Sequence, residues 1–303
     1  MEGTQRKIRV AWLSVFSNAS LVAGKLAAGL FIGSVSVISE AIHSGIDLAA
    51  AVIALVAVRR AARSPDERHP YGHGKIENVS GTIEAILIFG AAAWIIYEAL
   101  HKLAARRPVE GLGLGIAVMA VSAAANYAVS SMLFKVGRET DSIALQADGW
   151  HLRTDVWTSL GVLAGLSVVA LGERLLPRVP LWWVDPVAAI VVALLILKAA
   201  WDLTRHSLRD LLDESLGEEE NGWITGEIRR CPGVRDMHKL RTRRAGAQRF
   251  IDFHIQVDPE LSVTEGHEVA RSLKARLRKR FPGASVNIHV EPEEAEPAVP
   301  RGR

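Results

Sequence analysis

Two stretches of the chain repeat one arrangement of imidazole and carboxylate side chains. One contains His43 and Asp47 in the pattern E-x-x-H-x-x-x-D, and the other contains His151 and Asp155 in the pattern D-x-x-H-x-x-x-D. In a helix, residues spaced by three and four lie on one face, so each stretch would present His and Asp together. Two imidazole nitrogens and two carboxylate oxygens form a tetrahedral set that suits Zn²⁺ better than Mg²⁺ or Ca²⁺. The pattern predicts a divalent cation site between two helices.

Protons should compete with a metal ion at this site. A buried carboxylate without metal favours protonation, and His titrates at about pH 6.5 in water. Glu40 and Asp148 open the two repeats, and they could accept hydrogen bonds from the His ligands or carry protons. An alternative is that His and Asp join two helices by hydrogen bonds without any ligand. The repetition of the pattern favours the metal site.

Further His residues suggest weaker sites. The turn-rich segment PDERHPYGHGK places Asp66, His69 and His73 at spacings of three and four, which predicts a loop site, with a solvated polar loop as the alternative. The last third of the chain holds more candidates, which sequence alone does not bring together. They are His238, His254, His267, His289 and Glu291.

Six apolar stretches in the first 205 residues are long enough to cross a bilayer core of about 30 Å. They are residues 10–32, 35–58, 79–100, 111–134, 142–166 and 181–201. Buried helices of a large soluble bundle would need a polar outer stripe, and the fourth stretch has no charged residue. The connecting segments carry ten Lys and Arg on the N-terminal side of the membrane against five on the other, so both termini are expected in the cytoplasm.

The last third of the chain has about twice the charge density of the rest, which predicts a soluble domain. Its patterns predict a helix at 218–230, strands at 235–243 and 248–257, a helix at 262–281 and a strand at 285–290, in the order αββαβ. We therefore expect an α-helical membrane domain at 1–208, a cytoplasmic α/β domain at 209–292 and a disordered tail at 293–303.

Composition excludes other classes of protein. The net charge is +3 for the whole chain and zero for the last third, which argues against nucleic acid as a partner. The single cysteine, Cys231, excludes an internal disulfide framework and a thiolate metal cluster.

The chain resembles the cation diffusion facilitators, and most of all their bacterial zinc/iron efflux branch. The resemblance covers residues 8–292 and rests on SEAIHSGIDL, HPYGHGKIE, ADGWHLRTDVWTSLGVL, FIDFHIQVD and FPGASVNIHVEP. It implies a homodimer with a transport site at His43, Asp47, His151 and Asp155, and a loop site at Asp66, His69 and His73. It also implies a binuclear zinc site in a metallochaperone-like, ferredoxin-like cytoplasmic domain, lined by His238, His254, His267, His289 and Glu291. Lys75 and Asp213 match a charge pair that interlocks the two domains.

Two positions depart from some members of the family. His43 stands where others carry Asp, and the softer His2Asp2 set should favour Zn²⁺ over Cd²⁺ or Mn²⁺. Glu291 replaces a shorter Asp, and the extra methylene could leave one zinc position of the cytoplasmic domain weak.

The leading hypothesis is therefore a Zn²⁺/proton antiporter that exports metal across a bacterial inner membrane, with Fe²⁺, Co²⁺, Cd²⁺ or Mn²⁺ as alternative substrates. A metal-binding sensor or scaffold without transport is the alternative. An intramembrane metallohydrolase is disfavoured, because no H-E-x-x-H occurs and four protein ligands leave no open position for water. We expect no enzymatic activity.

Overall fold

The computed structural model describes residues 2–32, 35–105, 113–175 and 183–293. The predicted tail at 293–303 therefore lies, apart from its first residue, outside the described residues. The chain divides into two compact units, Met1–Leu208 and Arg209–Arg303.

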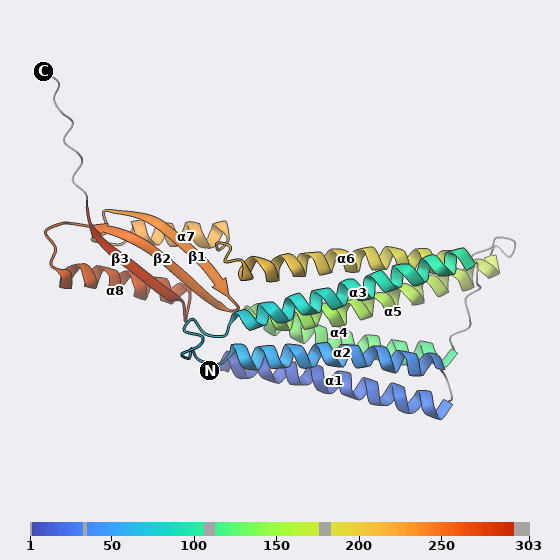
Figure 1. The fold of residues 1–303 in the computed structure, drawn as a ribbon. Coiled ribbons are helices and arrows are strands. Elements are labelled where there is room, and N and C mark those ends of the chain that lie inside the picture. Colours follow the sequence, from blue (N-terminus) through green and yellow to red (C-terminus); the bar gives the residue numbers. More distant parts are fainter. Residues whose placement is uncertain (1, 33–34, 106–112, 176–182, 294–303) are drawn as a thin grey trace, which may run out of the picture. The chain divides into compact units, whose positions relative to one another are not determined.

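Six long helices make up the described part of the first unit (Figure 1). They are α1 (Glu2–Ile32), α2 (Val35–Ala61), α3 (Lys75–Ala105), α4 (Gly113–Glu139), α5 (Ile143–Leu175) and α6 (Val184–Leu211), whose last turn continues into the second unit. Each helix continues past its predicted apolar stretch at one end or both. Among the described residues, three helices are long and apolar enough to cross a membrane, within Gly3–Ala28, Lys75–Ala105 and Pro186–Leu211. The count of six spans stays a prediction.

Small residues allow the helices of the first unit to approach closely. A Cβ atom added to Gly161 of α5 would lie 2.6 Å from Cγ2 of Val192 on α6. A Cβ atom added to Gly81 of α3 would lie 2.6 Å from Oγ of Ser207 on α6. Buried alanines dominate the core that α3, α5 and α6 share. Such close packing holds α5, which carries His151 and Asp155, in a fixed position among its neighbours.

The second unit is a three-stranded sheet with two helices (Figure 1). Its elements are α7 (Glu218–Arg229), β1 (Asp236–Ala245), β2 (Gln248–Val257), α8 (Val263–Arg280) and β3 (Ser285–Pro292), which confirms the order αββαβ. The strand order is β1-β2-β3, with β1 and β2 antiparallel and β2 and β3 parallel. The parallel pair requires a crossover, and α8 provides it.

Alternation along β2 separates the core of the second unit from its polar face. Ile251, Phe253 and Ile255 are buried in a core with Ile224 of α7 and Leu273 of α8. Because successive side chains of a strand point to opposite faces, the residues between them lie on the face away from this core. One of those residues is His254.

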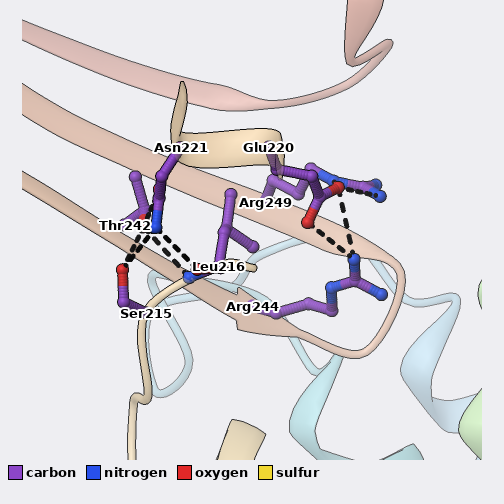
Figure 2. Close-up of polar contacts among 7 residues, drawn as sticks. All are labelled: Ser215, Leu216, Glu220, Asn221, Thr242, Arg244 and Arg249. Carbon is purple, nitrogen blue, oxygen red and sulfur yellow. Dashed lines mark hydrogen bonds and ion pairs between the residues drawn. The ribbon is translucent and has the colours of Figure 1, made fainter. Parts of the chain in front are cut away.

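Polar contacts fix the segment that leads into α7, as Figure 2 shows. The buried Thr242 of β1 donates a hydrogen bond from Oγ1 to Oδ1 of Asn221 at 2.8 Å and accepts one from the backbone N–H of Leu216 at 3.1 Å. At the start of α7, Glu220 forms ion pairs with Arg244 at 3.2 Å and Arg249 at 2.8 Å. These contacts tie α7 and the chain before it to the β1–β2 hairpin.

Candidate metal sites

Residues of α2 and α5 form a cluster in the helical unit in which two of the three side chains are buried and the third is half-buried. Asp47 of α2 and His151 and Asp155 of α5 each offer one ligand atom, and these atoms lie within 4.8 Å of one another. His151 Nε2 is 3.1 Å from Asp47 Oδ1, and both side chains are buried. The spacing of four residues puts His151 and Asp155 on one face of α5, and packing against α2 adds Asp47. The described part of this cluster therefore offers one imidazole nitrogen and two carboxylate groups.

For two predicted members of this region, the structure describes the helix but not the side chains. His43 and Glu40 belong to α2, four and seven residues before Asp47, but their side chains lie outside the described residues. Asp148 is fully buried on α5, three residues before His151. It is not among the residues whose ligand atoms gather in the described cluster.

Asn126 of α4 is a neighbour of this cluster that the sequence analysis missed. Its Nδ2 donates to Asp155 Oδ2 at 3.4 Å, and the side chain is buried. An amide inside an apolar stretch free of charge was a usable signal, because a polar side chain in a predicted membrane helix is expected to find a partner on a neighbouring helix. The partner itself depends on how α4 packs on α5.

The loop between α2 and α3 gathers all three of its predicted residues. The ligand atoms of Asp66, His69 and His73 lie within 4.8 Å of one another. Asp66 Oδ1 is 3.2 Å from His69 Nδ1, and Asp66 Oδ2 is 3.3 Å from His73 Nε2. The backbone N–H of His69 donates to Asp66 at 2.7 Å, and this bond is the main cause that lowers the pKa of the Asp66 carboxyl below its usual value. The loop thus holds an ionised carboxylate beside two imidazoles.

A third cluster lies on the polar face of the sheet in the second unit and consists of His238, His254 and Glu291. It is called the tail cluster below and is separate from the predicted tail at 293–303. The register pairs His238 of β1 with His254 of β2, and their ligand atoms and that of Glu291 lie within 4.8 Å of one another. His238 Nε2 is 3.0 Å and His254 Nδ1 is 2.6 Å from the carboxylate of Glu291. The bond with His254 is the main cause that lowers the pKa of Glu291.

The two other predicted His residues of this domain differ in their distance from the tail cluster. His289 pairs with His254 in the β2–β3 register, and its Nε2 lies 3.4 Å from Glu291 Oε1. His267 is exposed on α8 and is not part of the described cluster. Strand register could not be derived from sequence spacing, so the sheet supplies what the sequence analysis lacked.

The predicted charge pair involves residues of different units. Lys75 is the first residue of α3, and Asp213 follows α6. Within the second unit, Asp213 Oδ1 accepts a hydrogen bond from Arg243 Nη1 at 3.1 Å. A pairing of Lys75 with Asp213 stays a prediction.

Comparisons with known proteins match both units. Residues 11–212 match the family description "Cation efflux transmembrane domain", and residues 216–293 match "Cation efflux protein, cytoplasmic domain". An uncharacterised transporter of Synechocystis sp. is 36% identical over 291 residues, covering 94% of this chain and 90% of the relative. The cation-efflux pump FieF of Shewanella oneidensis is 32% identical over 294 residues, covering 95% and 97%. A solved structure described as "Mode of Action of a Putative Zinc Transporter CzrB" is 35% identical, covering 26% of this chain and 100% of the other, with a TM-score of 0.26.

Proposed function

The chain belongs to the cation efflux, or cation diffusion facilitator, family of membrane transporters, and from this premise we propose that it exports Zn²⁺ in exchange for protons. The family is one of membrane-embedded transporters and not of enzymes. The proposal concerns the ion that is transported, its coupling to protons and the residues that bind it.

The observation that carries the proposal is the cluster of the buried Asp47 and His151 with the half-buried Asp155. Two carboxylates neutralise a divalent ion in a region of low dielectric, and His43, one turn before Asp47, would add a second imidazole. A set of two nitrogens and two oxygens suits tetrahedral Zn²⁺. Fe²⁺, Co²⁺, Cd²⁺ and Mn²⁺ share such ligands, so they are the alternative substrates to compare.

Proton exchange follows from the chemistry of these ligands. His and Asp bind metal in their deprotonated forms, so binding releases protons and protonation releases metal. A site that opens alternately to the two sides would therefore carry Zn²⁺ one way and protons the other. Inward-moving protons would drive export.

The loop cluster of Asp66, His69 and His73 and the tail cluster are proposed as further metal sites. In this proposal the protein works as a homodimer, with His267 and His289 adding ligands near the tail cluster. Both termini would lie in the cytoplasm, and the relatives, which come from bacteria, favour an inner membrane as the location.

The test is Zn²⁺ flux into proteoliposomes under an imposed pH gradient of either sign. The wild-type chain should move Zn²⁺ in a direction that reverses with the gradient, and His43→Ala and Asp155→Ala should each abolish the flux. Matched controls are His206→Ala and Asp202→Asn, which change exposed residues of α6 and should leave flux intact.

Three results would count against the proposal. Full transport by Asp155→Ala would refute the site. Flux that ignores the pH gradient would refute antiport. Zn²⁺ binding without any flux would instead support the sensor or scaffold function.

A further inference from the structure

A bulge interrupts β1 directly after the first ligand of the tail cluster. His238 pairs with His254, but the next aligned pair is Arg241 with Asp252, so two residues of β1 face Phe253 alone. Lys239 is the first of these two residues. An extra residue in one strand breaks the regular alternation of side chains between the two faces.

Lys239 adopts a backbone conformation that side chains disfavour. Its φ angle is 54°, in the left-handed region, where a residue with a Cβ atom is strained. Glycine or asparagine would fit this position with less strain. Strained positions that the surrounding structure maintains are concentrated at functional sites, which directs attention to what this side chain contacts.

The bulge brings Lys239 to the same cavity as the tail cluster. In a regular strand, consecutive residues point to opposite faces, so Lys239 would point away from the face of His238. Here both residues line one open cavity of about 390 Å³, together with Gln256, Glu291 and Pro292. The cavity therefore combines two ligands of the tail cluster with a fixed positive charge.

The charge of Lys239 acts on the tail cluster. Lys239 and Glu291 line the same cavity, so an ammonium group shares this space with a carboxylate of the tail cluster. A positive charge there attracts the carboxylate of Glu291 and repels a divalent cation that binds to the cluster. Both effects reduce the gain from binding metal.

We propose that Lys239 sets the metal affinity of the tail cluster, and that its ammonium group keeps this affinity below what the ligands alone would give. The inference rests on the proposed function, because it assumes that the tail cluster binds a divalent cation. Its consequence is regulatory, since the cytoplasmic domain would fill with metal only when the metal concentration rises. For an exposed lysine, screened by water and salt, we expect an effect of about three- to tenfold in affinity.

The experiment measures Zn²⁺ binding by isothermal titration calorimetry to the full-length protein in detergent. Asp47→Ala, Asp66→Ala and Asp155→Ala together remove ligands from the other two clusters and give the parent protein. In this background, Lys239→Asn removes the charge with a residue that tolerates positive φ, and Lys239→Arg keeps the charge. Arg241→Gln is the matched control, because it removes one positive charge from the same strand at a position that does not line the cavity.

Lys239→Asn should bind Zn²⁺ about three- to tenfold more tightly than the parent, while Lys239→Arg and Arg241→Gln stay within about twofold of it. The gain should shrink when salt is raised, as a charge effect requires. Equal affinities for Lys239→Asn and the parent would overturn the inference. A similar gain from Lys239→Arg would also overturn it, because the cause would then be the backbone and not the charge.

Failure of the underlying proposal is a separate outcome. His254→Ala in the same background should abolish the measured binding. If the parent binds no Zn²⁺, or if His254→Ala leaves binding unchanged, then the tail cluster is not a metal site and the role of Lys239 falls with it. If His254→Ala abolishes binding and Lys239→Asn changes nothing, the tail cluster is a metal site but the inference about Lys239 is wrong.

Discussion

At the scale of single residues, the proposed transport ligands depend on a neighbour that binds no metal itself. Asn126 donates a hydrogen bond to Asp155 at 3.4 Å, and we expect this contact to help orient the carboxylate. Outer hydrogen-bond partners of metal ligands typically contribute about 10- to 100-fold in metal affinity. Asn126 is therefore a positioning residue for the proposed substrate site.

Asn126→Ala should raise KM for Zn²⁺ about tenfold or more and change the maximal flux less, because Asp155 keeps its charge but loses its orientation. The measurement is the concentration dependence of Zn²⁺ flux into proteoliposomes. Ser122→Ala is the matched control, a buried polar residue one turn earlier on the same helix. An unchanged KM in Asn126→Ala would show that the contact does not orient Asp155.

The same residues show how far sequence analysis reaches. His151 and Asp155 share a helix, so the helical repeat alone placed them on one face. Asn126 and Lys239 matter through contacts between elements, which residue spacing does not encode. The contact of Asn126 with Asp155 depends on how α4 packs on α5, and the position of Lys239 depends on a bulge between β1 and β2.

At the scale of elements, a buried ion pair joins the start of α1 to the start of α3. Lys7 Nζ donates to Glu77 Oε1 at 2.7 Å, and Ser142, directly before α5, donates from Oγ to Glu77 Oε2 at 2.5 Å. Glu77 is 1% exposed and Lys7 9%. The sequence did not predict this pair, since no spacing rule connects residues 70 positions apart. The positions of the helices were predictable from apolar stretches, whereas their ends and this junction were not.

Glu77→Gln should lower the free energy of unfolding by about 3–5 kcal/mol, because it leaves the buried ammonium of Lys7 without a charged partner. Replacing both residues, as Lys7→Met with Glu77→Leu, should recover most of the loss, since no buried charge then remains uncompensated. Thermal unfolding in detergent measures both effects. The control is the exposed pair of Arg6 and Glu139, where Glu139→Gln should cost less than about 1 kcal/mol. A Glu77→Gln protein as stable as wild type would contradict the role of this pair.

At the scale of the whole molecule, the tail cluster and the proposed transport site belong to different units of the chain. Coupling between them requires that metal in the tail cluster favours one of two arrangements of the dimer. The family descriptions cover both units, and the relatives match along nearly the whole chain, so the two units form one transporter. We expect metal binding in the tail cluster to draw the two cytoplasmic domains of a homodimer together.

Resonance energy transfer between two labelled copies can measure this movement. Ser272→Cys places a thiol on the exposed surface of α8, and the native Cys231 should not compete for label, because it is 3% exposed. Burial raises the pKa of the Cys231 thiol, so at neutral pH less of it is thiolate than for an ordinary cysteine, and its labelling should quicken only at higher pH.

Zn²⁺ added to a mixture of donor- and acceptor-labelled Ser272→Cys protein should increase the energy transfer. The combined change His254→Ala and Glu291→Ala should remove the increase, because it removes two of the three ligands of the tail cluster. His206→Ala, an exposed His of α6, should keep it. An increase that survives the loss of His254 and Glu291 would mean that Zn²⁺ acts elsewhere. No energy transfer in any condition would contradict the homodimer itself, since only associated copies bring donor and acceptor close together.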